Sequence, residues 1–364
     1  MTVVDEAATK ALAANEAAEI AAEVLPGYAG WDGSTIARLG AGLINRSYLL
    51  TRADGARAVL QAVSPIFSPA IHDNIVAVTE RLADAGMVTP RLLPARDGRP
   101  YLGAAGGTVW RLQTHVDGVA FDVIGRAAQA RAAGALVGRF HAAVDGLEHQ
   151  FTGLRAGVHD TPRHLARLGE AVAAHPGHRL AAAVSPLARA IIAGAAALPP
   201  LPALAPRVCH GDLKFNNVLF AGTRPPDDAR AVALIDLDTV GPLPLAYELG
   251  DAWRSWCNRA GEDEVNAALD LEIMRASLDG YREGLGHALR AEDRRALVLG
   301  VEWVSLELAA RFAADALAES YFGWNAGRFP GRGEHNLVRA RGQWSLHQAL
   351  VATREARAAM LATG

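Results

Sequence analysis

The chain has 364 residues, 51% of them hydrophobic, so it can bury a large core and is long enough for two packed units. Its 36 basic and 39 acidic residues leave a net charge of only −3 at pH 7. This balance excludes the strong positive field with which proteins bind nucleic acid or anionic membranes, and we expect neither as a partner. We expect two lobes that share a cleft, in a monomer or a homodimer.

The amino-terminal residues lack the basic region and apolar core of a secretory signal. The longest apolar region, residues 188–206, is interrupted by Arg189 and several prolines, so it does not predict a membrane span. We therefore expect a cytoplasmic protein. The two cysteines, Cys209 and Cys257, have no CxxC spacing, which argues against a disulfide scaffold, a zinc site or a redox motif and favours two buried free thiols.

The first third of the chain predicts a small β-sheet with one helix. Residues 1–30 are rich in alanine and glutamate and predict a leading surface helix. Apolar runs separated by turn residues then predict strands, and one longer segment has the apolar spacing of a helix. The strands are expected at residues 37–50, with a glycine turn in the middle, at 57–63 and at 108–115, and the helix at 69–85.

The rest of the chain has the pattern of a helical lobe. Alanine-, leucine- and arginine-rich sequence with helical periodicity begins near residue 122 and resumes after residue 246. A proline-rich segment at 198–206 and a Gly/Pro-rich insert at 322–336 interrupt the helices. The change of pattern places the two predicted lobes at residues 1–115 and 116–364.

Two short apolar runs, 218–220 and 231–235, predict a β-hairpin whose two ends carry polar loops. The loop before the hairpin has the sequence HGDLKFNN, and the loop after it begins IDLD. An aspartate alone in a loop more often caps a turn than takes part in chemistry. The ordered pair of loops, with charged and amide side chains at fixed spacing, favours chemistry over the cap.

The first loop supplies the groups that phosphoryl transfer requires: a carboxylate near the attacking hydroxyl, a cation on the phosphate and an oxygen ligand for magnesium. Asp212 is placed to accept the hydroxyl proton or to orient the nucleophile, and Lys214 to reach the transferred phosphate. Asn217 offers a neutral oxygen to a metal. His210 is expected to brace the loop, and Asp251, further along the chain, to accept hydrogen bonds from it.

The second loop supplies acidic metal ligands. Asp236 follows a strongly apolar strand, where a carboxylate that faces the cleft suits a hard cation such as Mg²⁺. Asp238 is expected either to share that role or to bind the substrate. The two loops together predict Asp212 and Lys214 as catalytic residues and Asn217, Asp236 and Asp238 as metal ligands.

These loops resemble those of the aminoglycoside phosphotransferase and choline kinase superfamily. The resemblance implies an α+β, two-lobed protein-kinase-like fold, with a small N-terminal antiparallel sheet lobe that carries one helix and a larger, mostly helical C-terminal lobe. It also implies an ATP- and Mg²⁺-dependent small-molecule kinase with Asp212 as the catalytic base. Further segments are similar to one branch, the N-acetylhexosamine 1-kinases: LINRSY at 43–48, AVLQ at 58–61, IDLDTV at 235–240, YELGDAWR at 247–254 and EHNLVRAR at 334–341.

The resemblance also implies where a nucleotide binds. Adenine would hydrogen-bond to the backbone at 113–116, where the chain crosses between the lobes. Kinase-like enzymes usually carry a lysine on the third strand, but Gln61 stands there in this chain, and a neutral amide cannot neutralise a phosphate. Lys214, magnesium and the turn at 40–47 would carry more of that charge, although glycines in such a turn serve a hairpin as readily as a phosphate. The residues expected to contact the nucleotide are Gly40, Gly42, Asn45, Ser47, Gln61, Gln113 and His115.

The acceptor implied by that branch is the anomeric hydroxyl of an N-acetylhexosamine or a related hexosamine. Arg311 and Tyr321 align with the segment that faces the sugar in the branch. Trp324, in a Gly-rich loop, is a further candidate contact, and His335 either faces the acceptor or caps the next helix. The segment 319–328 departs from the family in length and residues, so the identity of the acceptor stays open there.

Two other interpretations remain open. An enzyme of the same fold could phosphorylate an aminoglycoside, a choline-like amine or a homoserine-like alcohol. A cationic acceptor calls for acidic residues around its pocket, whereas the carboxy-terminal segment is rich in arginine and favours a neutral or anionic acceptor. The second alternative, a non-catalytic nucleotide-binding pseudokinase, is suggested by Gln61 alone.

Overall fold

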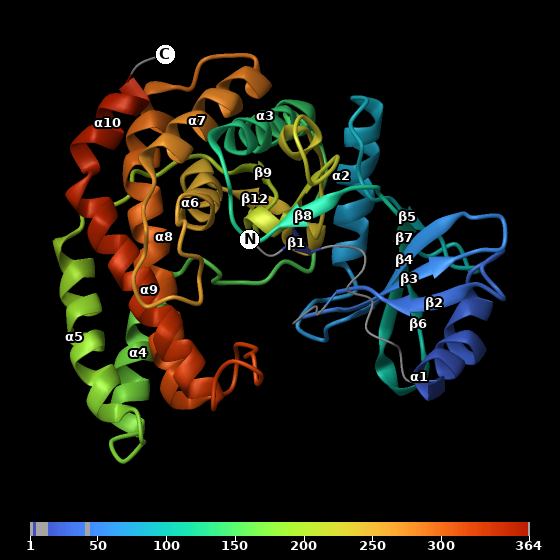
Figure 1. The fold of residues 1–364 in the computed structure, drawn as a ribbon, viewed down its shortest axis with the longest axis horizontal. Coiled ribbons are helices and arrows are strands. Elements are labelled where there is room, and N and C mark those ends of the chain that lie inside the picture. Colours follow the sequence, from blue (N-terminus) through green and yellow to red (C-terminus); the bar gives the residue numbers. More distant parts are fainter. Residues whose placement is uncertain (1–2, 5–13, 41–43, 363–364) are drawn as a thin grey trace.

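The computed structural model describes residues 3–4, 14–40 and 44–362. These residues form a lobe built around an antiparallel sheet and a larger lobe composed mainly of helices (Figure 1). The predicted α+β arrangement of a small sheet lobe followed by a helical lobe is confirmed. Within the described residues, no helix combines the length and the apolar character needed to cross a membrane.

The N-terminal sheet has six strands in the order β2-β3-β4-β7-β5, with β6 paired to β7. Strand β4 lies in the middle and is buried on both faces, as its apolar sequence RAVLQAV requires. The short strands β5 and β6 have only two residues each, too few to give a sequence pattern. The bounds are β2 Thr35–Arg38, β3 Arg46–Thr51, β4 Arg57–Val63, β5 Leu92–Leu93, β6 Leu102–Gly103 and β7 Val109–Thr114.

The predicted helix of this lobe is α2 Ile71–Asp84, which buries apolar side chains at helical spacing. The predicted leading helix is only partly confirmed. The chain is helical over α1 Ala14–Glu19 and the turns that follow it to Gly27, whereas β1 Val3–Val4 pairs with β8 Val119–Phe121 in the other sheet. Two β-branched valines suit an edge strand better than a helix. Our division of the chain at residue 115 stays a prediction, and residues 3–4 lie across it.

The second sheet has the order β1-β8-β10-β11 and contains the predicted hairpin, β10 Val218–Phe220 and β11 Ala231–Leu234. Its register pairs Val218 with Leu234, and the Ile235 amide donates to the Asn217 carbonyl at 3.0 Å. This pairing sets the loop before β10 directly beside the loop after β11. A separate two-stranded sheet joins β9 Arg207–Cys209 to β12 Gly241–Leu243, and β12 was not predicted.

The helical lobe is held by close helix pairs. Helices α3 and α7 approach so closely that a Cβ added to Gly134 would lie 2.0 Å from the Ser277 carbonyl oxygen, so only glycine fits there. The predicted continuous helical pattern is broken by loops at 175–180 and 257–270. The helices are α3 Ala127–Val144, α4 Thr161–Ala174, α5 Ala181–Ala197, α6 Leu245–Trp256, α7 Leu271–Leu285, α8 Ala291–Ala318, α9 Arg332–Ala352 and α10 Arg354–Ala362. Short 3₁₀ turns occur at Ala105–Gly107, Phe215–Asn217, Asp227–Ala229 and Leu237–Thr239.

The largest hydrophobic core joins the two lobes. It runs from α2, through Ile75 and Leu82, to side chains of the hairpin and of α3, α6 and α7. Smaller cores lie within the N-terminal sheet and between α4, α5, α8 and α9. Because the two polar loops lie next to this shared core, elements of both lobes surround them. Both cysteines are buried free thiols, as predicted.

Candidate active site

The predicted catalytic residues of the first loop lie together. The Lys214 Nζ is 3.0 Å from the Asp212 Oδ2. The Asn217 amide nitrogen donates to the Asp212 carbonyl at 2.8 Å and to its Oδ2 at 3.3 Å. Asn217 belongs to the 3₁₀ turn that leads into β10, so the five-residue spacing from Asp212 closes a compact loop. One carboxylate, one ammonium group and one amide therefore meet at one end of the hairpin.

Asp236 lies at the same open end of the hairpin, directly after β11, in a left-handed conformation with φ of 66°. Aspartate is among the few residues that adopt this conformation at moderate cost. Burial, followed by the nearby carboxylates of Asp238 and Asp212, raises the pKa of Asp236 to about 6. Burial lowers the pKa of Lys214, but the Asp212 and Asp236 carboxylates outweigh it and raise that pKa above its ordinary value. The carboxylates of Asp212 and Asp238 are therefore close enough to Asp236 to shift its pKa.

The donor set fits a hard divalent cation. Asp236 supplies a buried carboxylate that lies near the carboxylates of Asp238 and Asp212. Because the Asn217 nitrogen donates to Asp212, its amide oxygen is directed away from Asp212 and can act as a ligand. Carboxylate and amide oxygens are the ligands that Mg²⁺ and Ca²⁺ prefer.

Asp238 has partners that the sequence did not predict. Its Oδ2 accepts a hydrogen bond from the Asn45 side chain at 2.7 Å, and its Oδ1 is paired with the Arg111 guanidinium. Both Arg111 and Asp238 are buried, with side chains 2% and 3% exposed. Both oxygens of Asp238 therefore bind groups of the N-terminal lobe, and its role as a metal ligand stays a prediction.

The polar residues predicted to contact the nucleotide are hydrogen-bonded to one another. The Gln61 amide nitrogen donates to the Ser47 hydroxyl at 2.9 Å, and its oxygen accepts from Arg111 at 2.8 Å and from Gln113 at 3.3 Å. The His115 Nδ1 lies 3.6 Å from the Asp117 Oδ1, in the connection between the lobes. Of the two turn glycines, Gly40 has φ of 66°, and Gly42 lies outside the described residues.

The catalytic loop is braced by Glu248 of α6. Its two carboxylate oxygens accept hydrogen bonds from the backbone amides of His210 at 2.8 Å and Gly211 at 2.9 Å. The sequence predicted that Asp251 would accept hydrogen bonds from this loop. That prediction is wrong, because the Asp251 Oδ1 accepts from the Arg254 Nε at 2.8 Å and its Oδ2 has no hydrogen-bond partner. One helical turn separates the two acids, and only Glu248 lies on the buried face of α6. The His210 ring, as a bracing residue would, lies 2.9 Å from the carbonyl of Ile235.

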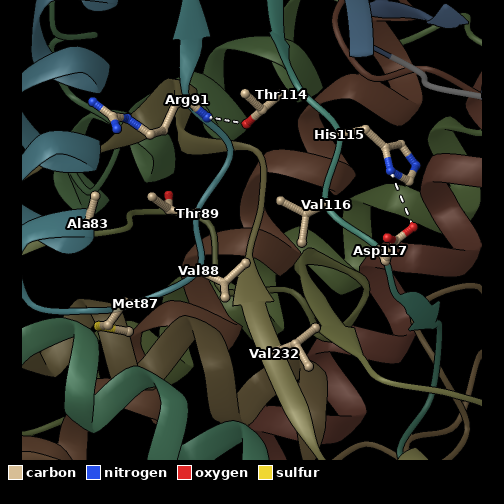
Figure 2. Close-up of a pocket in the computed structure, with 10 residues that line it drawn as sticks. All are labelled: Ala83, Met87, Val88, Thr89, Arg91, Thr114, His115, Val116, Asp117 and Val232. Atoms are coloured by element: carbon tan, nitrogen blue, oxygen red, sulfur yellow. Dashed lines mark hydrogen bonds and ion pairs between the residues drawn. The ribbon is translucent and has the colours of Figure 1, made fainter. Parts of the chain in front are cut away.

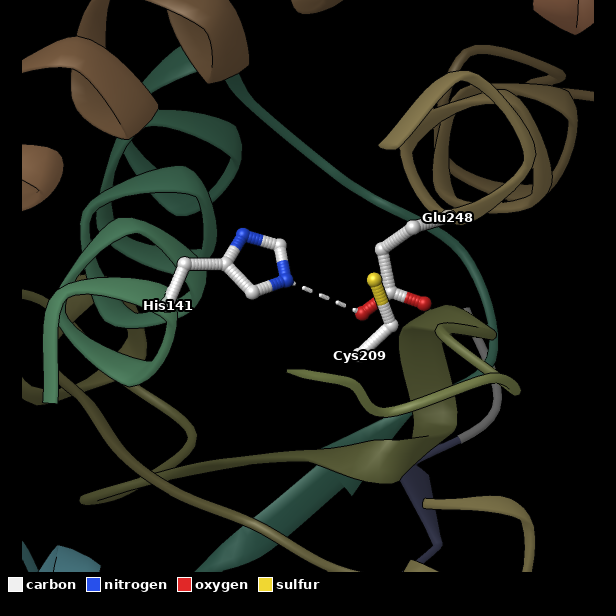
Figure 3. Close-up of side chains that lie close together, drawn as sticks. All are labelled: His141, Cys209 and Glu248. Atoms are coloured by element: carbon white, nitrogen blue, oxygen red, sulfur yellow. Dashed lines mark hydrogen bonds and ion pairs between the residues drawn. The ribbon is translucent and has the colours of Figure 1, made fainter. Parts of the chain in front are cut away.

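Glu248 also belongs to a buried group of three potential metal ligands (Figure 3). The ligand atoms of His141, Cys209 and Glu248 lie within 4.8 Å of one another. Hydrogen bonds account for all three: His141 bonds to Glu248 at 3.3 Å and to Tyr281 at 2.9 Å, and the Cys209 thiol donates to a backbone carbonyl. Burial raises the pKa of the Cys209 thiol well above its ordinary value, which disfavours the thiolate that a metal would need. We interpret the group as a brace for the catalytic loop.

Gly211 occupies a position that only glycine fills well. Its φ is 81°, and an added Cβ would lie 2.6 Å from the Thr239 carbonyl oxygen. The Thr239 hydroxyl donates in turn to the His210 carbonyl at 2.9 Å. The catalytic loop and the loop that contains Asp236 are therefore in direct backbone contact.

Two hollows lie near these loops. One, of about 520 Å³, borders the connection between the lobes and the segment after α2, and its lining includes none of the acidic residues of the two loops (Figure 2). The other, of about 340 Å³, adjoins the catalytic loop through Gly211 and the second loop through Asp238. Its polar lining otherwise comes from Arg155, His159, Asp160, Thr239 and Tyr247. The smaller hollow thus reaches both loops.

Three of the four residues predicted to bind the acceptor contact other side chains of the protein. Tyr321 accepts a hydrogen bond from Arg155 at 2.6 Å, and Arg311 lies over the ring of Phe322. His335 is buried, with its ring 2.8 Å from Asp263. The expectation that His335 caps a helix is wrong, since α9 begins earlier, at Arg332 after an extended Gly331. Trp324 lies partly buried in the loop before α9.

Sequence reasoning missed Arg111, Glu248 and His141. Each shows a weak signal in retrospect: a charged residue inside the apolar strand VWRLQT, and polar residues on the apolar faces of α6 and α3. Buried charges in such places are rare unless they are paired. Their partners lie 37 to 127 residues away, so the sequence could not identify them.

Comparison with known proteins adds a family and a fold. Residues 35–295 match the family described as the phosphotransferase enzyme family. An aminoglycoside phosphotransferase from Alicyclobacillus acidocaldarius is similar in structure, with 17% sequence identity, a TM-score of 0.58 and coverage of 97% of this chain and 96% of that one. A choline/ethanolamine kinase family protein from Mesorhizobium loti has 20% identity, a TM-score of 0.54 and coverage of 96% and 99%. An amicoumacin kinase in complex with AMP-PNP and Ca²⁺ has 14% identity, a TM-score of 0.56 and coverage of 87% and 88%. At these identities the similarity shows the fold, and the predicted kinase-like architecture is confirmed.

Proposed function

The chain belongs to the phosphotransferase enzyme family, and on that premise we propose that it is an ATP- and Mg²⁺-dependent kinase of a neutral small molecule. Membership makes it a phosphotransferase that acts on hydroxyl groups of small molecules. The first acceptor that we propose is the anomeric hydroxyl of an N-acetylhexosamine or a related hexosamine. The observation that carries the proposal is the meeting of Asp212, Lys214, Asn217 and Asp236 at the open end of one hairpin.

Asp212 acts as the general base in this proposal. Lys214 and Asn217 hold its Oδ2, which leaves Oδ1 to take the proton from the acceptor hydroxyl as that oxygen attacks the γ-phosphorus. Lys214 offers its positive charge to the transferred phosphate, whose equatorial oxygens carry the negative charge in the transition state. Electrostatic stabilisation and positioning are the main contributions that a protein makes to this reaction.

Asn217 and Asp236 would hold the divalent cation, with Asp238 as the third predicted ligand. The charge of that cation would offset the negative charge of the phosphates. The amicoumacin kinase, which has a similar fold, is described in complex with AMP-PNP and Ca²⁺, and this supports a nucleotide and a divalent cation as ligands of this chain. Adenine would bind the backbone at 113–116, and the phosphates would lie near Gly40 and Ser47.

The hollow of about 340 Å³ beside Gly211 is the proposed acceptor site. Its volume lies in the range of small-molecule pockets. Apolar side chains, among them Leu154 and Leu243, alternate in its lining with Arg155, His159 and Tyr247, a mixture that suits a sugar ring with hydroxyl groups. Tyr321, expected to contact the sugar, bonds to Arg155 at the edge of this hollow. Arg155 is matched by Asp160 in this lining and Asp238 is paired with Arg111, so the hollow has no excess of acidic groups to favour a cationic acceptor.

A screen of acceptors tests the proposal. ADP release would be measured with Mg²⁺-ATP over N-acetylhexosamines, hexoses, aminoglycosides and amino alcohols, and the phosphate on each product would be located. We expect turnover of an N-acetylhexosamine with loss of the reducing end. Turnover of amines alone would replace the proposed acceptor with a cationic one. Nucleotide binding without turnover of any acceptor would instead support a pseudokinase.

A further inference from the structure

A buried charge pair connects the two lobes at the loop that follows Asp236. Arg111 comes from β7 of the N-terminal sheet, and its carboxylate partner, Asp238, comes from the 3₁₀ turn after β11. Asn45, also of the N-terminal lobe, donates to the second oxygen of the same carboxylate at 2.7 Å. We name Arg111, Asn45 and Asp238 the interlobe clasp. Two donors of one lobe thus converge on one acceptor of the other.

The orientation of Arg111 is fixed from its own side. Ser47, Gln61 and Arg111 are direct cross-strand neighbours on β3, β4 and β7, so their side chains lie on one face of the sheet. Gln61 accepts from the Arg111 Nε at 2.8 Å and donates to Ser47 at 2.9 Å. The planar guanidinium is therefore held at Nε by Gln61 and at Nη1 by Asp238, which together leave it one orientation.

Asn45 is fixed in the same way. Its side-chain oxygen accepts from the Ser64 backbone amide at 2.9 Å, which directs its nitrogen to Asp238. On the other side, Thr239 hydrogen-bonds to His210 of the catalytic loop. The connections run from the sheet through Asp238 and Thr239 to the catalytic loop, and Asp236, in its left-handed conformation, lies two residues before Asp238. Such a conformation persists only where its neighbours hold it.

The charge of Arg111 is not available to a triphosphate. Its buried partner carries the opposite charge, so the pair presents no net charge, and removal of one partner would leave the other buried and uncompensated. A phosphate contact would require a guanidinium directed into the cleft with its charge unmatched. The geometry instead suits a group that positions its neighbours.

We propose that Arg111 is a positioning residue for phosphoryl transfer, which acts through Asp238 to hold Asp236 in place against the catalytic loop. Gln61 orients Arg111 in this arrangement, which gives the neutral residue at that position a function. The clasp also makes the geometry of the proposed metal ligand depend on the contact between the lobes. The consequence for metal binding rests on the proposed function, whereas the clasp itself does not.

The test compares Arg111→Met, Arg111→Lys, Asp238→Asn and the double variant Arg111→Met/Asp238→Asn. The matched control is Arg52→Met, which removes an arginine of the same lobe that is 41% exposed and paired with Asp54. Backbone hydrogen exchange would be measured over residues 231–243, and Mg²⁺-AMP-PNP affinity by calorimetry. Turnover would be split into kcat and KM for Mg²⁺-ATP.

We expect Arg111→Met to speed exchange at residues 236–240 by about tenfold or more, with the rest of the chain close to the parent. Mg²⁺-AMP-PNP affinity should fall by about tenfold, with a partial recovery in Arg111→Lys. Both residues act through one contact. The Mg²⁺-AMP-PNP affinity of the double variant should therefore lie within about threefold of the affinity of the weaker-binding single variant. The Arg52→Met control should match the parent in every measurement.

Three results would overturn the proposal: unchanged exchange at 236–240, faster exchange spread evenly over the chain, or fully additive losses in the double variant. If Arg111→Met does not fold, Asp238→Asn and Arg111→Lys are judged by the same criteria. Hydrogen exchange requires no acceptor and no nucleotide. A parent chain that fails to bind Mg²⁺-ATP would therefore refute the proposed function and leave the exchange data to decide on the clasp.

Discussion

The two polar loops of the site are supported by different parts of the molecule. The loop with Asp212 is held within the helical lobe, by Glu248 at two backbone amides and by the Trp256 indole, which donates to the Leu213 carbonyl at 2.7 Å. The loop with Asp236 is held from the N-terminal lobe, through Asp238. The direct supports of the proposed base thus come from its own lobe, whereas the proposed metal ligand depends on both lobes.

The sharpest test of this difference is Asp212→Asn. Loss of the proposed base should lower kcat by about 10²- to 10⁴-fold, because an amide cannot accept the hydroxyl proton. Nucleotide affinity should stay close to the parent, since the base acts on the acceptor rather than on the nucleotide. Turnover and Mg²⁺-AMP-PNP binding would be measured together, with the exposed Asp227→Asn as the control. A variant with near-normal turnover would remove Asp212 from its proposed role.

Asp236→Asn should act on both measurements. We expect Mg²⁺-dependent nucleotide affinity and kcat each to fall by about tenfold or more, because a neutral amide is a weaker ligand for a hard cation. A magnesium titration of AMP-PNP binding checks the first effect. If that titration matched the parent, Asp236 would not be a metal ligand, and the contrast between the loops would lose its functional meaning.

Glu248→Gln tests the support of the catalytic loop. The amide group of glutamine would set a donor against one of the two backbone amides that Glu248 now satisfies, and the free energy of unfolding should fall by about 1–3 kcal/mol. kcat should fall as well, with KM for Mg²⁺-ATP nearly unchanged. The control is Glu283→Gln, at a side chain that is 53% exposed. A rise in KM for Mg²⁺-ATP without a change in stability would contradict this assignment.

Acid should reveal the same brace. Burial raises the pKa of Glu248, but hydrogen bonds from His141 and the Gly211 amide outweigh it and hold the pKa below its ordinary 4.5. A carboxylate with a lowered pKa adds stability above its unfolded value, and this is lost as pH falls through the folded value. The stability difference between the parent and Glu248→Gln should therefore be full at pH 7 and shrink below pH 4.5. Denaturant unfolding at pH 7 and below pH 4.5 measures this stability difference. A difference that does not change with pH would refute the assignment.

The smallest effect is expected at the acceptor side. Tyr321→Phe removes the hydroxyl that accepts from Arg155, and KM for the acceptor should rise about two- to fivefold, because an exposed hydrogen bond contributes little. KM for Mg²⁺-ATP should not change. Tyr101→Phe, in the N-terminal lobe, is the control. An unchanged KM for the acceptor would place the acceptor away from Tyr321.

The spacing of residues within each loop made much of the site predictable. Asp212 and Asn217 lie within five residues, and a short hairpin brings Asp236 beside them, so local geometry alone brings these groups together. The support of the site was not predictable in the same way. Glu248 and Asp251 stand three residues apart in one helix, and the choice between them depends on which face of α6 meets the catalytic loop.

Local periodicity and spacings of a few residues were enough to predict the order of the lobes, the hairpin and the chemical groups beside its open end. The pairing of Arg111 with Asp238, the hydrogen bond of Asn45 to that carboxylate and the support of the catalytic loop by Glu248 all depend on the tertiary fold. The physical reason is that a buried charge must be paired, and the chain finds its partner through packing rather than through proximity in sequence.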